Sequence, residues 1–407
     1  MKSNNKQINI LVLNCGSSSL KYKVISMPKE EILITGEAQR VGIKTENAST
    51  ITHIISGKKK VIKSPLADHS TALKKILNLI NQEKNIKFDI IAHRYVHPGN
   101  YFNRPVRVTK SVLTKLKKTL PLAPIHNPIV YNLIKFCHKE FTFKNQYAVF
   151  DTSFHKTIPP KYSTYALSGE LIKKYGLRRI GFHGLSHRYV MEEACRFLKR
   201  NKSTQRIISC HLGTGGSSIC AIREGKSVNN SMGFTPLEGL MMNTRCGDID
   251  LGIVFYIMFK EFLSPDEAEN ILNKKSGVLG IFNTSSDLRD VIKNINNDKQ
   301  AKMVFNMYVR RVKAYIGFYS LILKKADILI FTDSLGVEEP ILRKEICENM
   351  ELLGIKLDER KNYSYCGKIA DISSPDSEVR ILVIPTNEEI MIAREVYREL
   401  KKNVSRC

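Results

Sequence analysis

Two short segments combine glycine, serine and charge in a way that suits the binding of a phosphate group. Asn14–Lys21 (NCGSSSLK) follows the apolar run Ile8–Leu13, and His211–Ser218 (HLGTGGSS) follows the apolar run Ile207–Cys210. Glycine lets backbone N–H groups approach an anion closely, while serine hydroxyls and a lysine add donors and charge. By itself the first segment also fits a plain hairpin turn with a solvated lysine. The second segment makes two phosphate-binding turns the better interpretation.

Arginine and histidine side chains in other polar turns could hold an anion. Arg94 lies in the segment HRYVH and Arg245 in TRCGD, and a guanidinium in such a turn can clamp a carboxylate or phosphate with two parallel hydrogen bonds. His126 stands in the proline-flanked turn PIHNP, and His183 stands in GFHG. Any one of these histidines is more often structural than catalytic, so their type alone does not assign a role.

The elements that must position these groups are buried strands that end in polar turns. Tyr147–Phe150 leads into Asp151, Ile328–Phe331 leads into TDSLG, and Ile381–Ile384 leads into PTNEE. Open α/β sheets build their sites at such strand ends. The pattern predicts an α/β protein.

An internal echo suggests two related domains. Residues 11–25 and 208–222 both read as a strand, a Gly/Ser turn and a second strand, about 200 residues apart. Apolar residues at fourfold spacing predict a helix over Ser186–Arg200. Thr386 and Glu389 have the spacing of a capping box, which predicts the start of a C-terminal helix and gives Glu389 a capping role.

Bulk composition favours a two-domain intracellular enzyme. The 407 residues exceed one ordinary core, and no stretch approaches the ~20 apolar residues of a membrane span. The nine cysteines form no CxxC pair, so reduced thiols are expected. The net charge of +25 is scattered in short groups rather than concentrated in a patch, so we expect neither a nucleic-acid nor a membrane partner.

Together these segments resemble the acetate kinase family over about residues 8–397. The motifs occur in family order, and they are NCGSSSLK, LAPIHNP, VFDTSFH, GFHGLSH, SMGFTPLEGLMM, TRCGDID and PTNEEIMIAR. The resemblance implies two RNase H-like domains of the acetate and sugar kinase/Hsp70/actin superfold with an interdomain cleft. It implies an N-terminal domain of residues 1–152 plus 388–407, with the first phosphate hairpin and the acetate contacts. Residues 153–387 would form a C-terminal domain with the second phosphate loop, the nucleotide site and the dimer interface.

The resemblance also implies the reaction and its participants. A cytoplasmic homodimer would transfer a phosphoryl group reversibly between ATP and acetate, giving acetyl phosphate and ADP, with Mg²⁺ or Mn²⁺ as cofactor. Such a reaction needs in-line positioning and neutralisation of charge, with little covalent work for the protein.

Site residues follow position by position from the same resemblance. The catalytic residues would be Arg94, His126, Asp151, His183 and Arg245. The acetate pocket would be lined, together with Arg94, by Val96, Ile125, Phe182 and Pro236. The metal would be held by Asn14 and Glu388. The phosphates and nucleotide would contact Ser17, Ser19, Lys21, His211, Gly213, Thr214, Gly215, Asp287, Leu288, Arg289, Ser334, Leu335, Gly336 and Glu338.

The sequence departs from the family pattern at His97-Pro98-Gly99 (HGG in the family), at Leu185 (threonine) and at Asn243 (glycine), but the largest departure lies where the phosphoryl donor would bind. Thr214 replaces an asparagine of the family's HLGNGAS, and the family's FTAGIGEN reads FTDSLGVE, with Asp333, Ser334 and Glu338 at changed positions. A serine in place of glycine adds a side chain and limits backbone freedom. Two alternatives therefore stay open beside an ATP-dependent kinase. One is the same chemistry with another donor such as pyrophosphate, and the other is a weakly active regulator that binds acetyl phosphate or a nucleotide.

Overall fold

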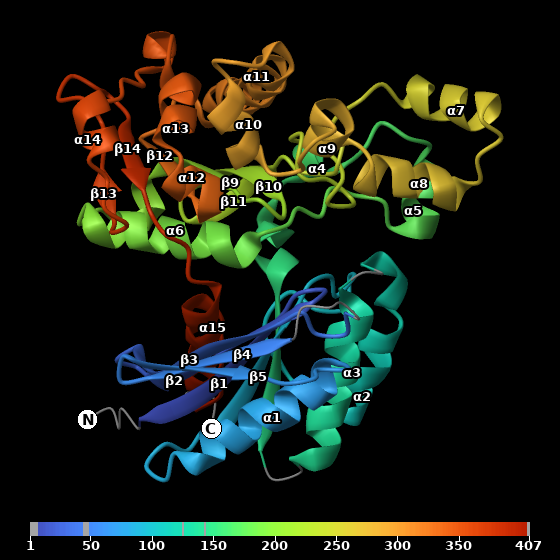
Figure 1. Cartoon of the computed structure of the whole chain (residues 1–407), viewed down its shortest axis with the longest axis vertical. Helices are drawn as coiled ribbons and strands as arrows, with labels where there is room; N and C mark the ends of the chain where they lie inside the picture. The colour runs from blue at the N-terminus through green and yellow to red at the C-terminus, as the bar shows by residue number, and fades with distance from the viewer. Residues whose placement is uncertain (1–6, 44–48, 124–125, 142–143, 405–407) are drawn as a thin grey trace. The chain divides into compact units, whose positions relative to one another are not determined.

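The structure, a computed structural model, describes residues 7–43, 49–123, 126–141 and 144–404. The chain divides into two compact units, which are described separately. Unit 1 comprises residues 1–153 with 387–407, and unit 2 comprises residues 154–386 (Figure 1).

Unit 1 is built on a sheet that has eight strands in the described residues, in the order β5-β4-β3-β2-β1-β6-β8-β7. Its strands are β1 Ile8–Cys15, β2 Ser19–Met27, β3 Glu31–Gln39, β4 Thr50–Ile55, β5 Lys58–Lys63, β6 Ile90–Tyr95, β7 Val106–Arg107 and β8 Asn145–Phe150. Its helical elements are α1 His69–Gln82, α2 Lys110–Lys117, the 3-10 turn η1 Leu120–Leu122, α3 Asn127–Glu140 and α15 Glu388–Val404, with η2 Asp151–Thr157 at the unit boundary. Helices α1, α2 and α3 cover one face of the sheet, and α15 lies on the other (Figure 1).

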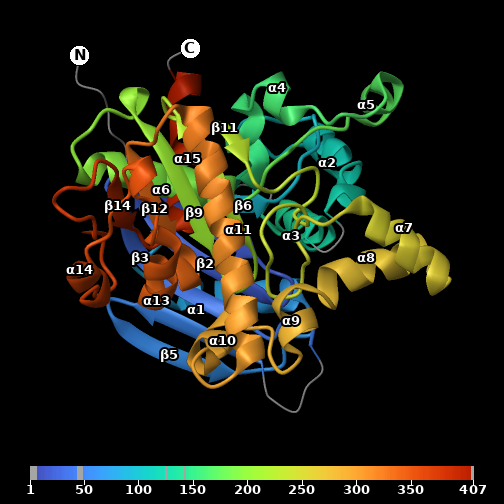
Figure 2. The same ribbon diagram turned by 90° about the horizontal axis from the view of Figure 1, so that it is seen from above.

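Unit 2 is built on a second sheet, with the order β11-β10-β9-β12-β14-β13. Its strands are β9 Arg206–Leu212, β10 Ser217–Arg223, β11 Lys226–Asn230, β12 Ile328–Thr332, β13 Ala370–Asp371 and β14 Arg380–Val383. Its helical elements are α4 Pro160–Ser163, α5 Gly169–Tyr175, α6 Gly184–Phe197, η3 Lys202–Thr204, α7 Leu251–Lys260, α8 Pro265–Lys274, α9 Gly277–Phe282, α10 Leu288–Asn294, α11 Lys299–Leu323, α12 Asp333–Glu338, α13 Pro340–Cys347, η4 Glu351–Leu353 and α14 Glu359–Tyr363. Helix α6 packs on one face of the sheet, while α11 and α13 close the core on the other face (Figure 2).

The two predicted Gly/Ser hairpins are confirmed. Strands β1 and β2 are antiparallel and meet at Cys15 and Leu20, and β9 and β10 are antiparallel and meet at Leu212 and Ser217. In unit 1 the first hairpin strand, β1, pairs in parallel with β6, which pairs in parallel with β8. In unit 2, β9 pairs in parallel with β12, which pairs in parallel with β14. Because the carboxyl ends of parallel strands lie at one edge of a sheet, the polar turns of each unit lie together at that edge of its own sheet.

Two other sequence predictions need correction. The helix expected over Ser186–Arg200 is α6, which runs from Gly184 to Phe197. At the start of α15 the capping contact comes from Asn387 rather than Thr386, whose hydroxyl donates to Ser186 Oγ at 2.9 Å. The Ile390 N–H donates instead to the side chain of Asn387 at 3.3 Å, and Glu389 turns to other partners.

A buried arginine organises the segment that follows β12. Arg343, on α13, is 1% exposed and donates to the carbonyls of Gly336 and Val337 at 3.0 and 2.7 Å. Its Nε donates to Asn362 Oδ1 at 2.7 Å, so one guanidinium joins α12, α13 and α14. No sequence pattern indicated this contact, since the segment was expected to be a loop and is the short helix α12.

Replacing Arg343 by methionine should lower the free energy of unfolding by about 2–4 kcal/mol, because buried carbonyl and amide oxygens lose their donors. Urea unfolding followed by circular dichroism measures the change. Arg360→Met on the exposed surface of α14 is the control and should change stability by less than about 0.5 kcal/mol. Equal effects of the two substitutions would contradict the role given to Arg343.

Candidate functional site

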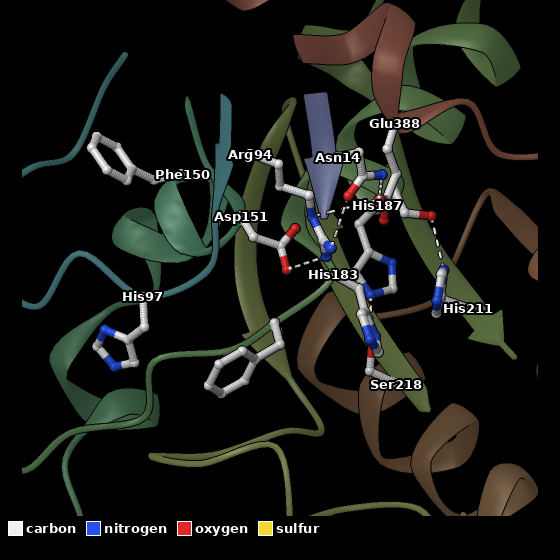
Figure 3. Close-up of polar contacts among 12 residues, drawn as sticks. Asn14, Arg94, His97, Phe150, Asp151, His183, His187, His211, Ser218 and Glu388 are labelled. Carbon is white, nitrogen blue, oxygen red and sulfur yellow. Dashed lines mark hydrogen bonds and ion pairs between the residues drawn. The ribbon is translucent and has the colours of Figure 1, made fainter. Parts of the chain in front are cut away.

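In unit 1, Arg94 is the centre of a charged cluster at the carboxyl end of the parallel strands. Its Nη2 lies 3.1 Å from Asp151 Oδ2, and its Nε lies 3.5 Å from Glu388 Oε2 (Figure 3). Its Nη1 donates to Asn14 Oδ1 at 3.4 Å. The four residues come from the ends of β1, β6 and β8 and from the start of α15, so residues nearly 400 positions apart meet at one guanidinium.

Opposite charges hold Arg94 in its charged state. Burial disfavours the charge, but Asp151, Glu388 and Glu389 outweigh it and raise the pKa of Arg94 above its ordinary value. The side chain of Arg94 is 16% exposed and that of Asp151 is 1% exposed, so the pair is largely removed from water. A buried charge remains stable only when it is paired in this way.

Sequence reasoning missed Lys23 and the true role of Glu389. Glu389 Oε1 accepts a hydrogen bond from Asn14 Nδ2 at 2.9 Å, and its Oε2 lies 3.1 Å from Lys23 Nζ. Burial would raise the pKa of Glu389, but Lys23 and Asn14 keep it below the ordinary value. The alternation of side chains along a strand could have indicated this contact. Lys21 and Lys23 lie on the same face of β2, and Lys21 pairs with Asn14 of β1.

The other predicted residues of unit 1 lie near the strand ends. Ser17 and Lys21 are exposed and Ser19 is half-buried in and beside the β1–β2 turn. Val96 is 6% exposed just after β6, and His126 is half-buried at the start of α3. Ile125, expected in the acetate pocket, lies outside the described residues.

In unit 2, the glycine-rich turn between β9 and β10 lies against a histidine and an arginine. A Cβ atom added to Gly216 would lie 3.4 Å from Arg245 Nη1 and 3.6 Å from Cε1 and Nε2 of His183. His183 has a φ of 56°, in the left-handed region, and directly precedes α6. Gly215, at the tip of the turn, has nothing within 4 Å of such a Cβ position. The turn therefore offers accessible backbone next to two side chains that can donate to an anion.

Arg245 differs from Arg94 in its electrostatic surroundings. Its Nη1 donates to the carbonyl of Pro236 at 3.4 Å. No ion pair joins Arg245 to a carboxylate in the part of the chain that the structure describes. Burial lowers the pKa of its guanidinium, and no opposing charge restores it. A buried cation without a counter-charge attracts an anionic ligand.

Two histidines behind the turn share one serine hydroxyl. Ser218 Oγ lies 2.9 Å from His183 Nδ1 and 2.8 Å from His187 Nε2 (Figure 3). The ring of His211 packs against that of His183 with centroids 4.1 Å apart and an interplanar angle of 30°, and its Nδ1 lies 2.9 Å from Ser186 Oγ. Phe182, the predicted pocket residue before His183, is 3% exposed.

Two residues of α12 that differ from the family pattern, Asp333 and Ser334, contact the glycine-rich turn directly. The carboxylate of Asp333 occupies the space that a Cβ atom at Gly213 would need, and its Oδ2 lies 3.2 Å from His211 Nε2. The Thr214 N–H donates to Ser334 Oγ at 3.1 Å. One backbone donor of the turn is therefore already occupied by a side chain of the protein.

The remaining predicted nucleotide contacts are of two kinds. Arg289 forms ion pairs with Asp287 at 2.7 Å and with Glu338 at 3.4 Å, and all three side chains are partly or fully exposed. Leu288 and Leu335 are 1% and 0% exposed in the core, so only their backbone could meet a ligand. Gly336 is likewise buried, and its carbonyl is bound to Arg343.

Comparison with known proteins assigns this arrangement to a family. The model of the Acetokinase family matches residues 9–394. The chain belongs to the acetokinase family. Acetate kinase of Thermotoga maritima is 44% identical over 408 residues, which cover 98% of this chain and 100% of that protein.

Solved acetokinase-family structures share the whole fold. Acetate kinase of Porphyromonas gingivalis matches with a TM-score of 0.88 and 39% identity over 97% of this chain and 100% of that one. A propionate kinase from Francisella tularensis matches with a TM-score of 0.88 and 37% identity over 95% and 98% of the two chains. The expected two-domain fold of the acetate and sugar kinase/Hsp70/actin superfold is confirmed, and the protein is a kinase.

Replacing Arg245 by alanine should lower the turnover of the kinase reaction by about 100-fold or more, because its charge would oppose the charge that develops on the transferred group. Arg310→Ala, on the exposed side of α11, is the control and should leave turnover within about twofold. Steady-state kinetics with both variants measures the difference. Near-native turnover in a folded Arg245→Ala protein would refute the role.

Proposed function

We propose that the protein is an acetate kinase that transfers a phosphoryl group reversibly between ATP and acetate. The observation that carries the proposal is the uncompensated guanidinium of Arg245, which lies beside the glycine-rich turn and the Nε2 edge of His183. The names of the relatives from Thermotoga maritima and Porphyromonas gingivalis support the same reaction. Formation of acetyl phosphate from acetate, ATP and Mg²⁺ tests it, and a folded protein without turnover would favour a regulator.

The residues of unit 2 would act on the phosphoryl group. In-line transfer spreads negative charge over the equatorial oxygens, and preorganised donors lower the energy of that state. Arg245 would supply a full positive charge, and His183 would donate a hydrogen bond from Nε2. The N–H groups of the turn His211–Ser218 would hold the donor phosphates, as glycine-rich turns do.

The residues of unit 1 would act on the carboxylate of acetate. Arg94 has two anionic partners already, and these fix the plane and direction of its guanidinium. Asp151 would therefore orient Arg94 rather than contact the acyl group itself. His126, Ser17, Ser19 and Lys21 would add donors along the path of the phosphates.

The residues proposed for the metal fit Mg²⁺ in ligand type. Glu388 offers a carboxylate and Asn14 an amide oxygen, and Mg²⁺ prefers such oxygen ligands together with water and substrate phosphates. The described residues contain no group of three or more His, Cys, Asp or Glu side chains arranged to hold a metal ion by themselves. This agrees with a cation that arrives with the donor, where it would neutralise charge on the phosphates. Arg94 shares the same carboxylate, so Glu388 would balance two cations.

A homodimer is supported by an apolar surface on unit 2. Helix α7 has no buried residue, and Leu251, Phe255 and Phe259 on it are 72, 71 and 76% exposed. A contiguous apolar surface of this kind is typical of a subunit interface. We therefore propose that a second copy of the chain covers α7.

None of the helices in the described ranges is both long and apolar enough to cross a bilayer. A cytoplasmic enzyme without a nucleic-acid partner remains the expectation.

Acyl specificity should follow from the size of the methyl pocket. Val96 and Phe182 are buried, so one extra methylene should make propionate react about 10- to 200-fold worse than acetate. Val96→Ala should narrow this gap, and Val61→Ala on the exposed side of β5 should not. Steady-state assays with acetate, propionate and butyrate measure kcat/KM for each variant. Preference for propionate would instead favour a propionate kinase, the name given to the Francisella tularensis protein. Equal use of butyrate and acetate would refute the proposal that the pocket admits little more than a methyl group.

A second candidate donor is favoured by one contact. Because Ser334 Oγ accepts the Thr214 N–H and Asp333 adds a carboxylate beside Gly213, the turn is less open to a nucleotide than a glycine segment would be. We expect ATP to be used with a weak KM and little discrimination among purines. Pyrophosphate is the alternative donor, and activity with pyrophosphate and none with ATP would establish it.

Ser334→Gly should lower the KM for ATP by about 3- to 10-fold, because the Thr214 N–H becomes available to a phosphate oxygen and one hydrogen bond contributes about 1 kcal/mol. Ser334→Ala is the matched control, since it removes the hydroxyl and keeps the Cβ atom. The same gain in both variants identifies the hydroxyl as the cause, and a gain in glycine alone identifies side-chain bulk. Unchanged KM values for ATP, GTP and pyrophosphate in both would show that the contact has no influence on the donor.

A further inference from the structure

Ser218 connects the predicted catalytic histidine to a second, fully buried one. Its hydroxyl lies between His183 Nδ1 at 2.9 Å and His187 Nε2 at 2.8 Å (Figure 3). Beyond it, His187 Nδ1 lies 2.9 Å from Ser209 Oγ. Ser209, His187 and Ser218 are all 0% exposed, so this chain of hydrogen bonds is shielded from bulk solvent.

A serine hydroxyl has one proton, so it donates to one histidine and accepts from the other. If Ser218 donates to His183 Nδ1, then His187 carries its proton on Nε2 and the proton of neutral His183 is on Nε2. If Ser218 donates to His187 instead, His183 must carry a proton on Nδ1. The direction of this one hydroxyl therefore determines which nitrogen of neutral His183 can donate.

The partners of Ser209 decide the direction. Burial, followed by the neighbouring His155 and His211, lowers the pKa of His187 well below its ordinary value, so His187 is neutral and has a single N–H. Within the described ranges, His187 is the only hydrogen-bond partner of the Ser209 hydroxyl. If His187 donated to Ser209, the buried proton of Ser209 would have no acceptor, which costs about 1–3 kcal/mol. Ser209 therefore donates to Nδ1 of His187.

We propose that Ser218 and His187 are positioning residues that hold His183 in the tautomer whose Nε2 carries the proton. Hydrogen bonds then run from Ser209 to His187, from His187 to Ser218 and from Ser218 to His183. The Nε2 edge of His183 lies against Gly216, so the proton faces the turn that would hold the phosphoryl group. This inference rests on the proposed function for its catalytic meaning, but the tautomer itself does not.

The backbone supports the same orientation. The φ of 56° at His183 sets its ring beside Ser218, and Ser218 lies directly opposite His211 in the β9–β10 register. The ring of His211 also packs against one side of the His183 ring, which is therefore held there and at Nδ1. Fixing the tautomer and the orientation of a ring through its second nitrogen is how histidine is prepared for catalysis in other enzymes.

Nuclear magnetic resonance of the native protein tests the tautomer without reference to activity. The protein is labelled with ¹⁵N-histidine, and the signal of His183 among the ten histidines is identified by its loss in His183→Asn. At pH 7.5 we expect the pattern of a neutral ring protonated on Nε2. A neutral ring protonated on Nδ1, or a doubly protonated ring, would overturn the proposal whether or not the protein is active.

Kinetics of variants tests the positioning role. Ser218→Ala should lower kcat by about 10- to 100-fold with KM for acetate changed less than about threefold, because binding does not need the tautomer. Ser218→Thr keeps the hydroxyl and should restore most of kcat. The spectrum of Ser218→Ala should show His183 as a mixture of tautomers, which a purely structural role of the serine would not produce.

Ser227→Ala is the matched control for the loss of a buried hydroxyl. Ser227 is 0% exposed on β11, and its Oγ lies 2.8 Å from Nδ1 of another histidine, His155. We expect kcat of Ser227→Ala within about threefold of the native value. Equal losses in Ser227→Ala and Ser218→Ala, or no rescue by threonine, would overturn the proposal. Absence of acetyl phosphate formation in the native protein would refute the proposed function alone, since the spectrum would still report the tautomer.

Discussion

The compensation of buried positive charge is the constraint on which both units depend. In unit 1 the guanidinium of Arg94 is surrounded by Asp151, Glu388 and Asn14, so the protein itself supplies the negative charge. In unit 2 the guanidinium of Arg245 has, among the described residues, a carbonyl and a sulfur atom as its hydrogen-bond partners. The first arginine is thereby a fixed part of the fold, and an anion bound beside the second would supply the charge that its protein partners do not. The chain thus contains one buried arginine whose charge is balanced by carboxylates and one whose charge is not.

Much of this arrangement could be predicted from sequence because it rests on local patterns. Strand–turn–strand segments with Gly and Ser predicted both hairpins, and motif order predicted the family. Contacts between distant segments carried no local signal. The spacing of Thr386 and Glu389 indicated a capping box, but the carboxylate of Glu389 instead binds Asn14 and Lys23. Arg343 gave no signal at all, since its importance lies in burial rather than in a motif.

Three positions that depart from the family pattern, Thr214, Asp333 and Ser334, lie together in space. Thr214 contacts Ser334, and Asp333 contacts His211 and fills the space beside Gly213. Sequence comparison treats these changes as separate, although two segments about 120 residues apart carry them. Because they contact one another, these changes have a joint effect. Side chains of α12 take up a backbone N–H and the space beside Gly213 that would otherwise be open to a ligand. Thr214, Asp333 and Ser334 therefore belong to one contact between the β9–β10 turn and α12.

The return of the C-terminal helix to unit 1 has a consequence for the order in which the chain can fold during synthesis. Unit 2 is a continuous stretch, residues 154–386, and is complete when residue 386 has left the ribosome. Unit 1 lacks α15 until residues 388–404 emerge, and with it the buried side chains of Met391, Ile392 and Val396 and the carboxylate of Glu388. Domains usually fold in the order of their synthesis. Here the unit that is begun first is finished last, and Arg94 stays without one of its carboxylate partners for most of the time that the chain is being made.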